Sequence, residues 1–290
     1  MKKYPALVCA LAMFALPVFA ACSDDPASSV DTILPPEEIV VPDVPEVTPP
    51  EEEIVPPTEP APPAVTPPVT VPPVVAPPEK PAAAEYLKIK TDNLNVRKGA
   101  GTNYASLGLV EKNILMKYAG KSGNWYETRY MGQKAFVHSD HATVVSLDKA
   151  DDKTEKIIEE GLNVLGTPYV YGATRLHDGK GNLLKGFTEK KFDCSSLMQF
   201  MFYKGADILL DVTTRTQVLQ GSVVQDELKR GDLMFFTNAS RKNNIGIERV
   251  GHVALYLGDN YILHTASDYA KIEQISSTRW GYYLSAKRMY

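Results

Sequence analysis

The chain has 290 residues and a net charge of −4, but the charge is unevenly distributed. Residues 23–84 hold twelve acidic side chains and one basic side chain, and Lys2 and Lys3 precede them, which leaves about +5 on residues 85–290. A surplus this small, without an arginine-rich run, gives no support to nucleic acid as a partner and fits an acidic polymer instead.

The first 21 residues have the pattern of a secretory signal peptide. Lys2 and Lys3 precede an apolar run over residues 6–19, which is too short to span a membrane. The run ends at Phe19-Ala20-Ala21-Cys22, which resembles the bacterial lipoprotein processing box, although its phenylalanine replaces the usual aliphatic residue. We therefore expect an exported lipoprotein, anchored to a membrane through lipidated Cys22 and facing the cell wall or periplasm. Ordinary cleavage that leaves Cys22 free is the alternative.

Residues 22–84 are dominated by proline and acidic side chains. Eighteen of the 22 prolines lie between Pro35 and Pro81. Such a segment buries too little apolar surface to offset the chain entropy lost on folding, so we predict an extended, disordered linker. Because Cys9 leaves with the signal peptide and Cys22 takes the lipid, Cys194 has no partner for a disulfide.

Residues 85–147 alternate apolar and polar side chains between turn clusters, which predicts a small all-β barrel. The run from Leu94 to Tyr104 and the later Trp125-Tyr126 resemble the bacterial SH3-like domain of cell-wall proteins. In that family the domain often binds wall peptides or shapes a neighbouring active site. Trp125 is either a core residue, the commoner case in so small a barrel, or a platform for a ligand.

The unpaired cysteine lies at the start of a predicted helix. This helix runs over apolar residues from Cys194 to Gly205, with Asp193 or Ser195 as its cap. Free N–H groups at a helix start favour thiolate over thiol, so Cys194 is a candidate nucleophile. A buried structural cysteine is the alternative.

Two histidines are predicted on one face of a β-hairpin. If a three-residue turn at Gly258-Asp259-Asn260 pairs Leu257 with Tyr261, then His252 and His264 lie diagonally, about 7 to 8 Å apart between backbones. Their rings are then close enough for a hydrogen bond, which fits either a general base with an orienting partner or a metal site. The remaining histidines, expected on the surface, are His138, His141 and His177.

Ordered motifs over residues 150–290 resemble the NlpC family of cell-wall cysteine peptidases. The motifs are, in chain order, Gly166-Thr167-Pro168-Tyr169-Val170-Tyr171-Gly172, Asp193-Cys194-Ser195, Arg230-Gly231-Asp232-Leu233-Met234-Phe235-Phe236, Gly251-His252-Val253-Ala254 and His264. The resemblance implies a papain-like α+β domain, in which the helix with the cysteine packs on an antiparallel sheet, and no cofactor or metal. It also implies cleavage of peptidoglycan stem peptides, in the wall or in released fragments, between D-γ-glutamyl and a diamino acid.

The resemblance also implies roles for single residues. Cys194 would be the nucleophile, His252 the base and later the acid, and His264 the residue that orients His252. The Tyr169 hydroxyl is an oxyanion candidate beside the Cys194 backbone N–H. These four residues make up the expected catalytic site.

The residues that flank the cysteine bear on substrate choice. Asp193 and Ser195 match positions that bind the free amine of an N-terminal L-alanine in members fused to SH3-like domains, and Asp193 as a plain helix cap is the alternative. Ser196 and Ala173 replace glycines that are usual in the family, and the loop over residues 174–191 is longer than usual. We expect this insertion to border the substrate groove.

Two other hypotheses compete with the peptidase. In the first, the chain is a wall-binding lipoprotein with amidase or acyltransferase activity. In the second, it is a zinc hydrolase in which Cys194, His252 and His264 are the metal ligands. Inhibition by chelators together with indifference to a thiol alkylator would favour zinc.

Overall fold

The computed structural model describes residues 83–290. The predicted signal peptide, Cys22 and nearly all of the predicted linker lie outside the described residues. Within residues 83–290, no helix is both long enough and apolar enough to cross a membrane.

The first part of the described chain is an all-β barrel, as its alternating pattern predicts. Alternate strand positions such as Leu87 and Ile89 point into a buried apolar core. Trp125 lies outside this core, partly exposed, and its ring meets that of His138 edge-on with centroids 5.0 Å apart. Trp125 is thus not a core residue of the barrel, and its alternative role as a platform for a ligand stays a prediction. The strands are β1 (Ala83–Ile89), β2 (Leu94–Arg97), β3 (Ser106–Val110), β4 (Leu115–Lys117), β5 (Gly120–Ser122), β6 (Trp125–Tyr130), β7 (Gln133–His138) and β8 (Ala142–Asp148).

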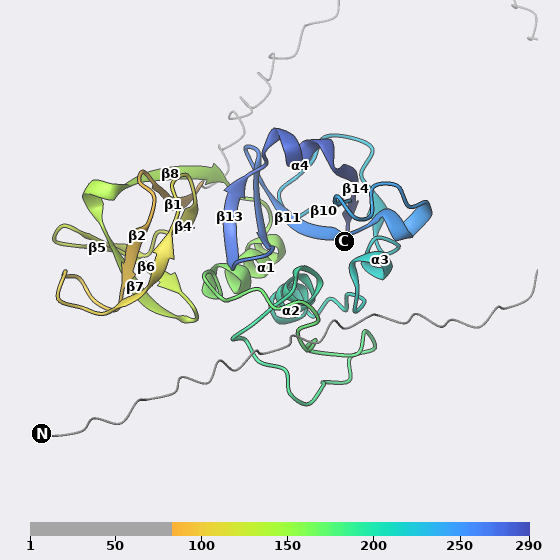
Figure 1. The fold of residues 1–290 in the computed structure, drawn as a ribbon, viewed down its shortest axis with the longest axis horizontal. Coiled ribbons are helices and arrows are strands. Elements are labelled where there is room, and N and C mark those ends of the chain that lie inside the picture. The colour runs from red at the N-terminus through yellow and green to blue at the C-terminus, as the bar shows by residue number, and fades with distance from the viewer. Residues whose placement is uncertain (1–82) are drawn as a thin grey trace, which may run out of the picture. The chain divides into compact units, whose positions relative to one another are not determined.

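The second part is an α+β unit in which helix α2 packs on strands β11 and β12, and α1 packs on α2 (Figure 1). Its helices are α1 (Asp152–Asn163), α2 (Cys194–Ala206), α3 (Thr214–Gln217) and α4 (Ser277–Gly281). Its strands are β9 (Ser222–Val223), β10 (Leu233–Phe236), β11 (His252–Gly258), β12 (Tyr261–Thr265), β13 (Ala270–Gln274) and β14 (Tyr283–Arg288). The predicted arrangement of a cysteine-bearing helix on an antiparallel sheet is confirmed.

One antiparallel sheet runs through both parts. Its strand order is β8-β1-β4-β13-β12-β11-β10-β14-β9, and the remaining barrel strands form a second sheet, β3-β2-β7-β6-β5. The two parts meet where Leu115 on β4 pairs with Ile272 on β13. Nearby, Arg230 donates to Glu155 on α1 at 2.6 Å and to the Tyr86 hydroxyl on β1 at 2.7 Å. The barrel therefore shares a hydrogen-bonded framework with the sheet that carries both histidines.

The packing of α1 against α2 depends on a glycine. A Cβ added to Gly205 would lie 2.6 Å from the backbone N and Cα of Ile157, so any larger residue there forces the two helices apart. Asp151 caps α1 by accepting the N–H groups of Lys153 and Thr154 at 3.0 Å. The cap and the glycine together place α1 directly behind the cysteine helix.

The β11–β12 hairpin keeps the predicted register but has a different turn. Leu255 pairs with Leu263, which is the expected alignment. Gly258 pairs with Tyr261, so the turn contains two residues, Asp259-Asn260, with φ values of 48° and 64°. The expected three-residue turn is wrong, and a bulge just before Gly258 absorbs the difference. The two histidines therefore still face the same side of the sheet.

His177 departs from its predicted surface position. It is completely buried, and its ring packs against that of Tyr203 on α2 with centroids 5.0 Å apart. The reason is that the loop over residues 174–191 folds back on the helix, which its polar composition does not reveal. His138 and His141, at the end of the barrel, are partly exposed and exposed, as expected.

Candidate active site

Cys194 is the first residue of α2, and Asp193 caps this helix. The Asp193 carboxylate accepts the N–H of Ser196 at 2.8 Å, and the Ser196 hydroxyl accepts the N–H of Asp193 at 2.9 Å. This capping box fixes the start of the helix and with it the direction of the cysteine side chain. Within residues 83–290 Cys194 forms no disulfide, and the residue is only 8% exposed.

A chain of hydrogen bonds runs inward from His252. Its Nε2 lies 3.1 Å from Nδ1 of His264, and Nε2 of His264 lies 2.9 Å from Oε1 of Glu273. Glu273 in turn accepts a hydrogen bond from Arg279 at 3.1 Å and lies 3.7 Å from the ammonium of Lys271. His264 is completely buried between the two partners. The hydrogen bond between the rings agrees with the predicted register.

This chain fixes the tautomers of both histidines. Burial raises the pKa of Glu273, but the hydrogen bond from His264 and the charges of Lys271 and Arg279 outweigh it and bring the pKa to about 2. The ionised carboxylate only accepts, so Nε2 of His264 carries its proton. Burial lowers the pKa of His264, which leaves Nδ1 of the neutral ring as an acceptor for Nε2–H of His252. Nδ1 of His252 is then the free basic nitrogen.

The thiol and the imidazole are both neutral in the resting site. Burial, followed by the charge of Asp193, raises the pKa of Cys194 to about 11, although the backbone amides of Val253 and Ser195 act in the opposite direction. Burial also holds the pKa of His252 well below its usual range, and His264 adds to this effect. The expectation that the helix start favours the thiolate is therefore outweighed by desolvation.

Tyr169 is held beside the cysteine by backbone pairing. It forms a parallel bridge with Phe192, two residues before Cys194, and its N–H donates to the carbonyl of Asp268 at 2.8 Å. Burial, with Cys194 and Asp193 nearby, raises the pKa of the Tyr169 hydroxyl. The hydroxyl thus keeps its proton and can donate a hydrogen bond.

Two cavities meet at Cys194. One, of about 350 Å³, is lined by His252, Phe236 and Arg279, and the other, of about 450 Å³, is lined by Asp193, Ser195 and three arginines. Both cavities share Tyr169, Cys194, Asn238 and Gly251. A substrate that occupies both would therefore lie across the sulfur, which is the arrangement needed to cut a chain.

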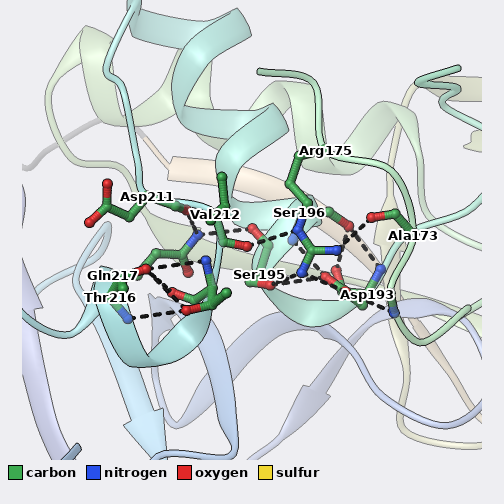
Figure 2. A network of polar contacts seen from close by, with 11 residues as sticks. Ala173, Arg175, Asp193, Ser195, Ser196, Asp211, Val212, Thr216 and Gln217 are labelled. Atoms are coloured by element: carbon green, nitrogen blue, oxygen red, sulfur yellow. Dashed lines mark hydrogen bonds and ion pairs between the residues drawn. The ribbon is translucent and has the colours of Figure 1, made fainter. Parts of the chain in front are cut away.

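Asp193 has a second partner that the sequence does not reveal. The guanidinium of Arg175 lies 2.9 Å from Oδ2 of Asp193 and donates to the Ser195 hydroxyl at 2.9 Å (Figure 2). The helix-cap role of Asp193 is present in the structure. The role of Asp193 and Ser195 in binding a substrate amine stays a prediction, and such an amine would compete with Arg175.

The donor set does not suit zinc. Nε2 of His252 and Nδ1 of His264 are joined by a hydrogen bond, and Nε2 of His264 forms a second hydrogen bond with Glu273. This leaves Cys194 and one nitrogen of His252, fewer than the three protein ligands typical of catalytic zinc. Within residues 83–290, no group of three or more His, Cys, Asp or Glu side chains is arranged to hold a metal ion.

Two residues of the site escaped sequence reasoning. The sequence held a signal for Glu273, because Lys271 and Glu273 alternate with apolar residues and therefore lie on one face of their strand. Lys271 pairs with His264, so this is the face on which His264 lies. Arg175 has no such signal, since it lies in the irregular loop over residues 174–191.

The comparisons with known proteins agree with this architecture. Residues 166–289 match the model of the NlpC/P60 family, and residues 92–143 match that of the bacterial SH3 domain. A gamma-DL-glutamyl hydrolase of Bacillus subtilis is 32% identical over 151 residues, which are 51% of this chain and 32% of the relative. A gamma-D-glutamyl-L-lysine dipeptidyl-peptidase of the same organism is 30% identical over 190 residues, which are 63% of this chain and 56% of the relative. The matched part thus spans a third to just over half the length of these relatives.

A crystal structure of an NlpC/P60 family protein from Bacillus cereus is also similar, with 22% identity and a TM-score of 0.38, over 71% of this chain and 63% of that one. The fold is that of an α+β unit preceded by an SH3-like barrel. The chain carries an NlpC/P60 family domain behind a bacterial SH3 domain, which confirms the resemblance seen in the motifs.

Proposed function

We propose that the protein is an exported cell-wall hydrolase, a cysteine endopeptidase that cuts peptidoglycan stem peptides between D-γ-glutamyl and a diamino acid. The observation that carries the proposal is the hydrogen-bonded series His252, His264 and Glu273, which begins at the cavity that Cys194 also lines. The printed names of two relatives, a gamma-DL-glutamyl hydrolase and a gamma-D-glutamyl-L-lysine dipeptidyl-peptidase, support the bond type.

The first half of the reaction forms an acyl-enzyme. As the Cys194 sulfur attacks the γ-carbonyl carbon of the glutamyl residue, its proton passes to Nδ1 of His252. The carbonyl oxygen becomes an oxyanion, which the Cys194 backbone N–H and the Tyr169 hydroxyl stabilise. The imidazolium then gives its proton to the departing amine of the diamino acid, and the C–N bond breaks.

The second half releases the glutamyl product. His252, neutral again, takes a proton from water, the hydroxide oxygen attacks the thioester carbon, and the sulfur leaves with the proton from His252. His264 stabilises the imidazolium formed in each half because its Nδ1 accepts the Nε2–H of His252. The ionised Glu273 supports that charge one ring further away.

The rest of the chain fits delivery to the wall. We propose a signal peptide over residues 1–21, a lipidated Cys22 with a linker to residue 84, an SH3-like barrel over residues 85–147 and a catalytic domain over residues 150–290. The barrel would add contacts to peptidoglycan, for which the partly exposed Trp125 beside His138 is a candidate surface.

A stem-peptide digest tests the activity. The wild type and Cys194→Ala are incubated with L-Ala-γ-D-Glu-diamino acid peptides of both common diamino acids, each with a free and with an acetylated N-terminal amine, and the products are identified by mass spectrometry. We expect the L-Ala-D-Glu dipeptide, free or acetylated, from the wild type and none from Cys194→Ala. Absence of this product from the wild type with every peptide refutes the peptidase, whereas removal of the acetyl group alone points to an amidase.

A further inference from the structure

The cavity on the Asp193 side of Cys194 contains a cation supplied by the chain itself. The side chain of Arg175 is only 18% exposed. Its Nε donates to the carbonyl of Val212 at 2.8 Å, its Nη1 to the carbonyl of Ala173 at 2.6 Å, and its Nη2 to Asp193 and Ser195 (Figure 2). Four partners on three segments of the chain hold this guanidinium, so it is a fixed part of the cavity wall.

The Asp193 carboxylate has no acceptor site to spare. Its Oδ1 accepts from the Ser196 N–H at 2.8 Å and the Ser195 hydroxyl at 3.0 Å, and its Oδ2 faces the Gly172 N–H at 3.2 Å and Arg175 at 2.9 Å. A carboxylate offers about four lone-pair positions, and all are used. A substrate ammonium would have to displace Arg175 and leave it nearly buried without a counter-charge, which is strongly unfavourable.

Two more arginines give the cavity a positive excess. Arg215 and Arg241 line it together with Arg175. Both share a single carboxylate, Glu248, at 3.4 and 3.1 Å, and the Glu248 side chain is 57% exposed. Three guanidinium groups thus face two carboxylates, one of them largely in water. This side of the cleft attracts an anion and disfavours a cation.

We propose that this cavity binds a substrate segment that carries a carboxylate and has no free amine. Within the proposed function, on which this inference rests, that segment is a γ-linked D-glutamyl residue preceded by an acylated L-alanine. A γ-linked glutamyl residue keeps its α-carboxylate, which suits Arg215 and Arg241. An acylated alanine has no ammonium to compete with Arg175. The enzyme would then act on stem peptides whose N-terminus is still joined to another group at least as well as on fragments with a free L-alanine.

Two matched peptide pairs test this inference on the full-length wild-type protein. The first pair is L-Ala-γ-D-Glu-diamino acid with a free or an acetylated amine, and the second pair has the glutamyl α-carboxylate free or amidated. We expect acetylation to leave kcat/KM unchanged or higher, and amidation to lower it about tenfold or more, as for a lost hydrogen bond to a charged group. A tenfold preference for the free amine overturns the inference while the proposed function stands. If none of the peptides is cut, the proposed function itself fails.

Single substitutions of Arg175 and Arg215 test which residue sets each preference of the enzyme for one peptide of a pair over the other. Arg175→Ala exposes the charge of Asp193, so its kcat/KM ratio of free to acetylated peptide should rise about tenfold over the wild-type ratio. Arg215→Gln is the matched control, which should reduce the discrimination between carboxylate and amide and leave the amine ratio unchanged. An amine ratio that stays at the wild-type value in folded Arg175→Ala contradicts the assignment. If that variant does not fold, the wild-type peptide pairs still decide.

Discussion

Replacing Glu273 by glutamine separates the orientation of His252 from its chemistry. Glu273 accepts from His264 Nε2 at 2.9 Å, and only an acceptor at this place keeps the free nitrogen of His252 unprotonated. A glutamine can turn its NH₂ toward His264, which reverses both tautomers and puts a proton on Nδ1 of His252. A hydrogen bond to a charged group contributes about 1.5–3 kcal/mol, so we expect kcat to fall roughly ten- to hundredfold. KM should change little, because Glu273 does not line either cavity at the cysteine.

The assay is steady-state cleavage of a stem peptide, combined with ¹⁵N NMR of the histidine rings. The matched control is Glu159→Gln on α1, where the glutamate is ion-paired with Lys117 and remote in sequence from the site. In the wild type the NMR spectrum should show protonated Nε2 on both His252 and His264, and in Glu273→Gln a mixture. A kcat within twofold of the Glu159→Gln value would refute the tautomer argument.

Three further predictions concern the dyad and the helix pair. His264→Gln should keep more activity than His252→Ala, because an amide oxygen can still accept the Nε2–H of His252. Because the pKa of Cys194 is raised to about 11, its alkylation by iodoacetamide in the free enzyme should keep accelerating above pH 9, as the thiolate fraction grows. Gly205→Ala should lower the stability by about 1–3 kcal/mol and Tm by several degrees, since its Cβ meets the α1 backbone at 2.6 Å. Gly281→Ala, with open space around the added Cβ, is the control.

One result would contradict each of these three predictions. Equal and complete loss in both histidine variants would remove the orienting role of His264. An alkylation rate that is already constant at pH 7 would mean that a thiolate–imidazolium pair forms in the resting enzyme. A Gly205→Ala protein as stable as Gly281→Ala would show that the helices separate without cost.

Sequence reasoning located the cysteine and both histidines because each lies in a regular element. A helix start identifies Cys194, and strand alternation places His252 and His264 on one face. The register survived a wrong turn length because the bulge before Gly258 offset the shorter turn. Two compensating deviations in the backbone are invisible to a count of paired positions, so this agreement was partly fortuitous.

The residues that were missed reach the site through tertiary contacts. Arg175 approaches Asp193 from an irregular loop, and nothing in the local pattern says which way such a loop folds. The same loop buries His177, whose polar neighbours suggest exposure. Glu273 was within reach of pattern analysis, but only after its strand had been recognised as the partner of the strand that carries His264.

The pairing of β4 with β13 has a consequence for how the protein unfolds. β13 carries Glu273 and would be the outer strand of the catalytic sheet if the barrel were removed. Its backbone N–H and C=O groups would then be open to water or to another chain, and edge strands of this kind promote aggregation. The barrel covers this edge of β13 at the one position where Ile272 pairs with Leu115, so slow amide exchange next to Ile272 should be lost on truncation of the barrel. A catalytic fragment cut at the domain boundary would lose support under the very strand that positions the histidines.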